Sequence, residues 1–386
     1  MSAPLTTDSR TKLERDLPAK VEALDGLRGI AILLVLCCHF HAILDSDPKF
    51  VDITPWAPLN QLLLRGFLGV DLFFVLSGFL ITSLLFKTNI QKPYESMRHF
   101  YIRRVLRLFP ALFALLFASF IVSYFEKYSL SEQWTTTWSA VLFISNWNLK
   151  WNFGHIQSDL GHLWSLAVEE QFYLIWPSIL IALRYFRSPR WMYFLVVTSL
   201  VTLVVLHRIE LWNANEPWLF LYSRTDTRVD SMLVGCLVAF TYRYFDIDTK
   251  FLKALGVIAT IVVIPLAYHY AGGTQGFLYK GGFTLFAVLF GLIILACVSC
   301  ESVGTGFLSN RILKWFGKVS YGLYLWHVII FRISERHFHF GSNAFRFVTT
   351  TVFSLLVAEL SWRFIEQPFL RLKNRRYQEK HTLPIH

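Results

Sequence analysis

The feature that most constrains this chain is a series of apolar runs, each long enough to cross the hydrocarbon core of a bilayer. A transmembrane helix needs about 20 mostly apolar residues. The runs fall near 27–44, 67–86, 106–125, 166–184, 191–207, 229–245, 251–271, 281–300, 319–334 and 345–365. The sequence therefore predicts an all-α, polytopic transmembrane bundle of about ten helices.

Composition agrees with membrane residence. Hydrophobic residues make up 54% of the 386 residues and charged residues only 16%, whereas a soluble domain needs about twice that charged fraction on its surface. The 13 Trp and 16 Tyr residues suit the two headgroup levels, where amphipathic rings gather. The segment 135–147 is too weakly apolar to count as a span and could form an interfacial or re-entrant helix.

The distribution of Lys and Arg predicts the orientation. With the N-terminus in the cytoplasm, 24 Lys and Arg fall on the inside and 11 on the outside, as the positive-inside rule requires. We therefore expect a cytoplasmic tail over 1–21, a transmembrane domain over 22–370 and a basic cytoplasmic tail over 371–386. The same asymmetry accounts for the net charge of +11, so we expect no nucleic-acid partner.

All five cysteines lie inside apolar runs, namely Cys37, Cys38, Cys236, Cys297 and Cys300. We expect them to be small buried hydrophobic residues and not a disulfide framework. Only one CxxC spacing occurs, at Cys297 and Cys300, and a zinc site needs more ligands than this pair offers. No metal site is predicted.

Arg28 opens the first span and His39 lies further along it. Eleven residues of helix turn through only about 20° more than three full turns, so both side chains share one face, roughly 16 Å apart along the axis. Arg28 is expected near the cytoplasmic end and His39 in the outer half. His39 could simply bond a neighbouring helix, but imidazole is the side chain best suited to proton transfer near neutral pH.

The second span begins with Asp71 among small residues. Gly66, Gly69 and Gly78 are interpreted as positions where helix backbones approach closely. A carboxylate at the outer end of a span is either solvated, paired or part of a site. Asp71 is therefore a candidate site residue with two structural alternatives.

Three arginines precede the apolar part of the third span: Arg103, Arg104 and Arg107. On a helix Arg107 lies one turn beyond the other two, which predicts a compact cationic ledge at the cytoplasmic face. Guanidinium groups suit bidentate phosphate contacts. The alternative is that all three are topology anchors that extend to lipid headgroups.

The fourth span opens with His162, Ser165, Glu169 and Tyr173 within about 60° of one another on the helix. One face thus carries an imidazole, a hydroxyl, a carboxylate and a phenol. Packing does not explain the two adjacent acids, Glu169 and Glu170, at the start of an apolar helix, so we interpret this cluster as functional. The adjacent Glu170 points about 100° away and could pair with a basic residue of another helix.

Two later segments carry further candidates. Arg228 and Asp230 lie at the outer end of the sixth span and form either a local ion pair or part of an acceptor pocket. In the ninth span Ser320, Tyr324 and His327 share a face. His327 is more often structural than catalytic in such a setting.

Seven ordered segments of this chain resemble the acyltransferase-3 family of integral membrane acyltransferases. They are LDGLRGIAILLVLCCHF, FLGVDLFFVLSGFLI, RRVLRLFP, HLWSLAVEEQFYLIWP, RVDSMLVG, SYGLYLWHV and FIEQPF, and they extend over about residues 22 to 370. The arginine–ten residues–histidine element of the family matches Arg28 and His39. Its basic motif before the proline of the third span matches Arg104 and Arg107.

The resemblance implies an enzyme of the inner membrane that transfers an acyl group, often acetyl, to a sugar hydroxyl. The implied donor is acyl-CoA, a co-substrate and not a bound cofactor, and the implied acceptor is a carbohydrate or a lipid-linked glycan. Some members carry an additional SGNH-type hydrolase-like domain, which we do not expect here because the sequence ends soon after its last span.

The polar residues of the spans and the family resemblance together predict three groups of site residues. The catalytic group is His39 with Glu169 and Asp71 as candidates to orient its ring. The donor group, for the phosphates of CoA, is Arg28, Arg103, Arg104 and Arg107, and the acceptor group is His162, Ser165, Arg228 and Asp230. Two rival hypotheses are a transporter or flippase, which would also bury such residues, and a non-enzymatic assembly factor.

Overall fold

The computed structural model describes residues 15–16, 21–44, 56–147, 159–272, 274–300, 306–338 and 341–371. These residues form helices and connecting turns, with no strand among them. The predicted all-α class is therefore confirmed. Most of the predicted tails, 1–21 and 371–386, lies outside the described residues.

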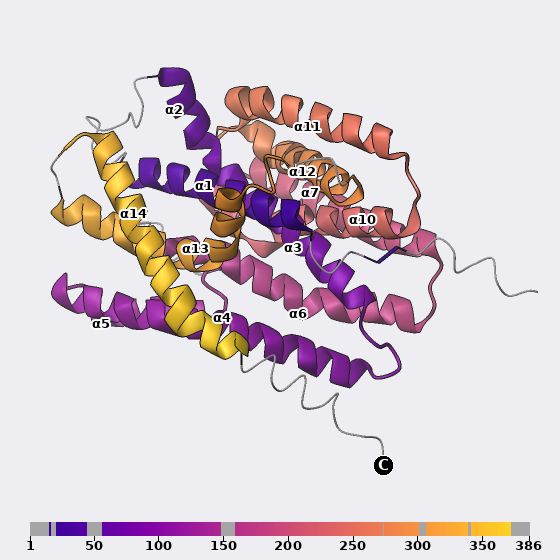
Figure 1. The fold of residues 1–386 in the computed structure, drawn as a ribbon, viewed down its shortest axis with the longest axis horizontal. Coiled ribbons are helices and arrows are strands. Elements are labelled where there is room, and N and C mark those ends of the chain that lie inside the picture. The colour runs from indigo at the N-terminus through magenta and orange to yellow at the C-terminus, as the bar shows by residue number, and fades with distance from the viewer. Residues whose placement is uncertain are drawn as a thin grey trace, which may run out of the picture.

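Most of the long helices, such as α4 and α6, run roughly along the longest axis of the molecule, whereas α14 crosses them obliquely (Figure 1). The bounds of the long helices are α1 Glu22–Leu44, α3 Leu68–Phe86, α4 Pro93–Phe125, α6 Trp164–Tyr185, α7 Arg190–Asn213, α10 Asp230–Tyr244, α11 Thr249–Tyr270, α12 Phe283–Ser299, α13 Arg311–His337 and α14 Asn343–Ser361. Each contains or closely matches one predicted span. Shorter elements connect them: α2 Ala57–Leu64, η1 Arg65–Phe67, α5 Leu130–Val141, η3 Gly161–Leu163, α8 Trp218–Ser223, α9 Thr225–Arg228, η4 Leu278–Gly282 and η5 Trp362–Glu366.

Eight of the described helical segments are long and apolar enough to cross a membrane. The two predicted spans outside this set are α10, which has 15 residues, and α13, which carries many charged residues in its 27. A multi-pass membrane protein follows from these eight segments. The count of ten and the cytoplasmic termini stay predictions.

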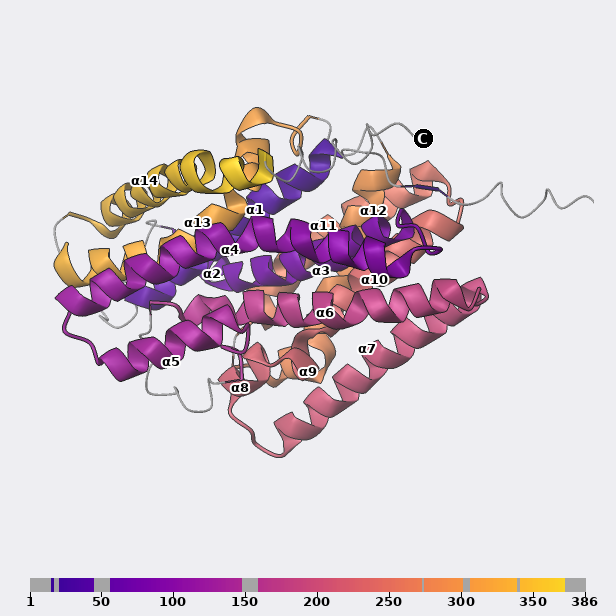
Figure 2. The same ribbon diagram turned by 90° about the horizontal axis from the view of Figure 1, so that it is seen from below.

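The ambiguous segment 135–147 belongs to α5 and the turns after it. With 12 residues, α5 is about 18 Å long and too short for a hydrocarbon core of about 30 Å. It folds back along the end of α4 (Figure 2), where Gln133 bonds both Ser119 and Ser123. It is therefore a helix on the side of the bundle and not an additional span.

Helix α4 begins at Pro93, well before the apolar run predicted over 106–125, and has 33 residues. At 1.5 Å per residue it is about 50 Å long, so it extends beyond the hydrocarbon core. The basic segment before the run is thus helical. Proline suits the first turn, where its missing N–H would have no partner.

Close backbone contacts hold α1 against α13 and α3 against α10. A Cβ atom added to Gly29 of α1 would lie 2.3 Å from the carbonyl oxygen of Leu313, and one added to Gly78 of α3 would lie 1.9 Å from that of Met232. Gly66 and Gly69 meet the backbone of α1 in the same way. The interpretation of these glycines as packing residues is confirmed.

Candidate active site

His39 from α1 meets His327 from α13 inside the bundle. Nδ1 of His39 lies 2.7 Å from Nε2 of His327, and the two rings are stacked with centroids 5.0 Å apart. His327 is fully buried, and the ring of His162 lies 5.3 Å from it. Three histidines from three segments of the chain thus form one cluster.

The two helices that carry this pair run parallel and close together. Lys314 bonds Glu22 at 2.7 Å near the first turns of α13 and α1, and His39 meets His327 further along both helices. Glycines make this approach possible: a Cβ atom on Gly317 would lie 1.9 Å from the carbonyl oxygen of Asp25. The backbones therefore approach closely enough for two imidazoles to bond directly.

A tyrosine joins the cluster to the helix that carries Ser165. The hydroxyl of Tyr324 donates to the carbonyl of His162 at 2.5 Å and lies 2.6 Å from Oγ of Ser165. Because one phenol has one proton, Ser165 is the donor in the second bond. Tyr324 and His327 lie on the shared face predicted for the ninth span. The sequence did not predict that this face contacts His39, His162 and Ser165.

A cavity of about 100 Å³ lies beside this cluster, between α1, α3, α4, α6 and α13. Its charged and hydroxyl-bearing side chains include Arg28, Ser77, Arg107, Ser165, Glu169 and Tyr324. Phe73 and Phe74 supply an apolar wall. Two arginines and the Ser165–Tyr324 pair therefore share the lining of one cavity, and Tyr324 also contacts His162 and His327.

Glu169 lines this cavity, but its bonding partners differ from the expected one. Its carboxylate accepts from Ser77 and, at 2.7 Å, from the hydroxyl of Tyr173. His39 bonds His327. The hypothesis that Glu169 orients His39 is therefore not supported by the contacts, although Glu169 stays at the site.

The three arginines of α4 do not form one ledge. Nε of Arg104 lies 2.8 and 2.7 Å from the two carboxylate oxygens of Glu170, and its guanidinium stacks 3.4 Å from the centre of the Tyr173 ring. Arg107 instead lines the cavity, and Arg103 is half-buried. The predicted pairing of Glu170 with another helix is confirmed, and it removes Arg104 from the proposed donor surface.

Asp71 belongs to a separate, fully buried network. Its Oδ1 accepts from Arg228 at 2.8 Å and from Ser231 at 3.0 Å, so Asp71 does not orient His39. Arg208 of α7 pairs with Asp230 at 2.9 Å. The hypothesis of a local Arg228–Asp230 pair is therefore wrong, because each residue pairs with a different helix.

This network ties α3, α7 and α10 together and leaves no exposed surface on Arg228 or Asp230. Neither can meet an acceptor without an opening of the bundle, so the structure moves both from the acceptor group to the framework. Arg208 was missed from the sequence. The available signal was a charged residue at the end of a predicted span, where a buried partner is the rule.

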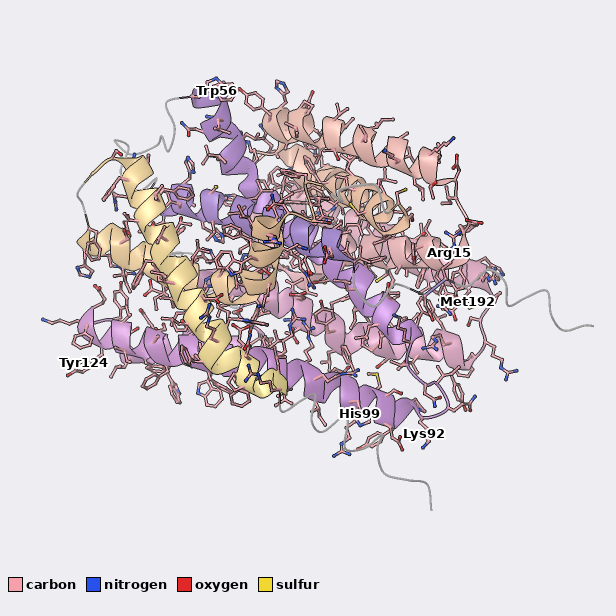
Figure 3. All side chains as sticks on the ribbon, in the orientation of Figure 1. Arg15, Trp56, Lys92, His99, Tyr124 and Met192 are labelled. Atoms are coloured by element: carbon pink, nitrogen blue, oxygen red, sulfur yellow. The ribbon has the colours of Figure 1, made fainter. Side chains whose placement is uncertain are left out.

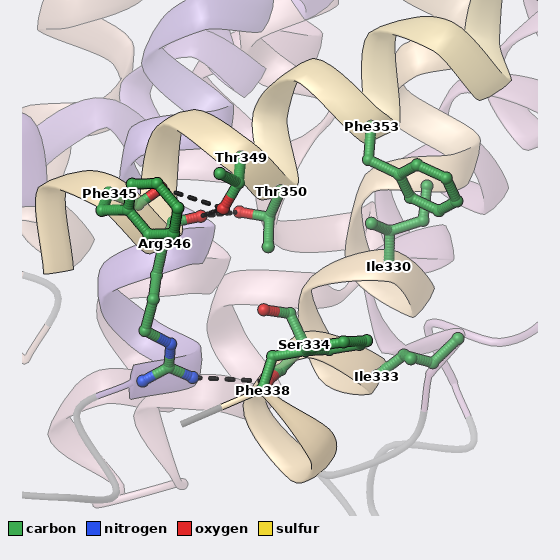
Figure 4. Close-up of a pocket in the computed structure, with 9 residues that line it drawn as sticks. All are labelled: Ile330, Ile333, Ser334, Phe338, Phe345, Arg346, Thr349, Thr350 and Phe353. Carbon is green, nitrogen blue, oxygen red and sulfur yellow. Dashed lines mark hydrogen bonds between the residues drawn. The ribbon is translucent and has the colours of Figure 1, made fainter. Parts of the chain in front are cut away.

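A second cavity, of about 290 Å³, lies between α13 and α14 (Figure 4). Its walls are mainly Ile and Phe side chains, and the hydroxyls of Thr349 and Thr350 donate to backbone carbonyls of their own helix. Arg346 donates to the carbonyl of Ser334 at 3.4 Å. This cavity has an apolar lining and shares no lining residue with the cavity beside the histidines.

Comparisons with known proteins give one family. The family model of an acyltransferase domain matches residues 21–363. The chain is 32% identical over 370 residues to O-acetyltransferase OatA of Staphylococcus aureus, covering 91% of this chain and 57% of that protein. It is also 32% identical over 365 residues to peptidoglycan O-acetyltransferase OatA of Listeria monocytogenes, covering 90% and 55%. The chain thus spans little more than half the length of these relatives, and no solved structure gives a significant match.

Proposed function

Because the chain belongs to the acyltransferase-3 family of integral membrane acyltransferases, we propose that it transfers an acetyl group from acetyl-CoA to a hydroxyl of a cell-surface carbohydrate. The name of the Listeria monocytogenes relative gives peptidoglycan as the acceptor of that protein, and we propose the same acceptor here. The observation that carries the proposal is a cavity whose lining includes two arginines and the Ser165–Tyr324 pair. Tyr324 in turn contacts His162 and His327 of the histidine cluster.

The size and charge of this cavity favour a donor whose small reactive end enters it. A cavity of about 100 Å³ is small, so only the acetyl thioester end of the donor, and not a whole CoA, would enter it. Arg28 and Arg107 supply positive charge to the lining, which the phosphates of the donor would meet. Arg28 lies near the predicted cytoplasmic end, from which acetyl-CoA would arrive.

His39 is the base in this proposal. A sugar hydroxyl is a weak nucleophile at neutral pH, and a positioned base that removes its proton raises the rate about 10²- to 10⁴-fold. Ser165, which bonds Tyr324 beside the cluster, and His162, the third histidine of the cluster, would contact the acceptor. Asp71, Arg228 and Asp230 have no place in this mechanism because they are bonded within the framework.

The proposal is tested by acetyl transfer in membranes that contain the protein. With labelled acetyl-CoA and peptidoglycan as acceptor, we expect label in base-labile esters. The His39→Ala variant should lose at least about 100-fold in rate, because the base is removed. His41→Gln is the matched control, since His41 is a buried histidine of the same helix that contacts the carbonyl of Cys37.

Full activity of His39→Ala, inserted at the wild-type level, would show that this histidine is not the base. Movement of a carbohydrate across the membrane without consumption of acetyl-CoA would instead favour the transporter hypothesis.

A further inference from the structure

A chain of two hydrogen bonds runs from the backbone of α13 to His39. The carbonyl oxygen of Leu323 lies 3.0 Å from Nδ1 of His327, one turn later on the same helix. Nε2 of His327 lies 2.7 Å from Nδ1 of His39. Nδ1 and Nε2 of His327 and Nδ1 of His39 therefore each have one defined hydrogen-bond partner.

The chemistry of these atoms decides where the protons are. A carbonyl oxygen only accepts, so Nδ1 of His327 carries a proton and donates it to Leu323. In the neutral ring Nε2 of His327 then has a lone pair and accepts. Nδ1 of His39 must be the donor to it, which leaves the lone pair of His39 on Nε2.

The opposite arrangement requires a positively charged His327 whose Nε2 donates to His39. His327 is fully buried, and its neighbours are the rings of His39, His162, Tyr324 and Phe331. None of these contacts within the described part of the chain is a carboxylate. A buried cation without a partner costs several kcal/mol, so the neutral arrangement is favoured.

We propose that His327 is a positioning residue that fixes His39 in the tautomer whose Nε2 is the catalytic base. This inference rests on the proposed function, because it names what orients the base of that reaction. It replaces the expected carboxylate partner with a neutral imidazole. His327 itself does not touch the substrate.

In the transfer step Nε2 of His39 takes the proton of the acceptor hydroxyl as the oxygen–carbonyl carbon bond forms. The carbon–sulfur bond of the thioester then breaks, and the same proton passes from Nε2 to the leaving thiolate. Nδ1 of His39 keeps its proton and its bond to His327 throughout. A ring free to adopt the other tautomer would present an N–H instead of a lone pair to the hydroxyl.

Variants of His327 separate this role from a packing role. His327→Met keeps an unbranched side chain of similar length but lacks a strong acceptor. We expect kcat to fall about 10- to 100-fold, the magnitude found when the hydrogen-bond partner of a metal-ligating histidine is removed and a part of the effect of the base itself. The KM for acetyl-CoA should be unchanged. His327→Gln, whose amide oxygen can accept from His39, should recover at least part of kcat, and His41→Gln again serves as the control. Wild-type kcat in folded His327→Met would overturn the proposal.

The tautomer itself gives a test that needs no active variant. In full-length protein labelled with ¹⁵N-histidine, we expect the His39 signal, assigned by its loss in His39→Ala, to show a protonated Nδ1 and an unprotonated Nε2 near pH 8. A protonated Nε2 would overturn the inference. If His39→Ala were inactive and Nε2 of His39 were protonated, the proposed function would stand and only the role of His327 would be lost.

Discussion

At the scale of residues, Arg104 and Arg107 show how one helical turn separates two roles. Both are on α4, but Arg104 turns to α6 and pairs with Glu170 where both side chains are mostly buried. Arg107 lines the cavity that also contains Arg28. The first arginine is thus part of the framework, and the second is available to a ligand phosphate.

The two arginines predict different defects for the same substitution. Arg107→Gln should raise the KM for acetyl-CoA about 10- to 100-fold, because a hydrogen bond to a charged group contributes about 1.5–3 kcal/mol. Arg104→Gln should instead lower the thermal stability of the protein, since removing one partner of a buried pair costs about 3–5 kcal/mol. Steady-state kinetics and thermal unfolding in detergent distinguish the two variants.

An unchanged KM in Arg107→Gln would return this residue to the role of a topology anchor. Equal stability of Arg104→Gln and wild type would show that Glu170 tolerates the loss of its partner.

At the scale of elements, the α1–α13 pair determines the site, and small residues determine the pair. Because Gly29 and Gly317 meet the opposite backbone directly, the axes approach closely enough for His39 to bond His327. The burial of α13 explains why this helix is not among the eight described segments that are apolar enough to cross a membrane. Residues along its length, including Val319, Leu323 and His327, are buried inside the protein, so fewer of its side chains must be compatible with lipid.

A methyl group at this interface should therefore disturb both packing and catalysis. In Gly29→Ala the new Cβ atom would lie 2.3 Å from a backbone oxygen, which forces the helices apart. We expect a lower yield of folded protein and a lower kcat in the fraction that folds. Gly306→Ala is the matched control, because nothing lies within 4 Å of its added Cβ atom. Equal yield and equal kcat in the two variants would contradict this account of the interface.

At the scale of the whole molecule, residues that are predicted to lie on the same side of the membrane lie at the same end of the bundle. Arg15, Lys92 and Met192 lie toward one end, and Tyr124 lies at the other (Figure 3). Contacts agree with this arrangement: Asp16 bonds Arg243 at the end of α10 at 2.7 Å. The arrangement is the one expected if α10 crosses the membrane despite its 15 residues.

Single cysteines on either side of α10 test that crossing. In a variant whose five native cysteines are replaced by alanine, Ala214→Cys should react with an impermeant maleimide in intact cells. Asp246→Cys should react only after the membrane is opened, because an odd number of spans separates the two positions. If both positions were labelled from the same side, α10 would not cross the membrane. The predicted ten spans would fall to nine, and the two termini would lie on opposite sides.

The sequence by itself determined the helical class, the position of each apolar segment, the family and the motif residues Arg28 and His39. These features depend on residues that are close in the sequence, so they can be recognised in it. A span must be apolar to lie in lipid, and residues three, four, seven or eleven apart on a helix share a face. Only the tertiary structure decided the partners. It paired His39 with His327, Glu170 with Arg104 and Asp71 with Arg228, because periodicity specifies the face of a helix and does not specify which other helix packs against that face.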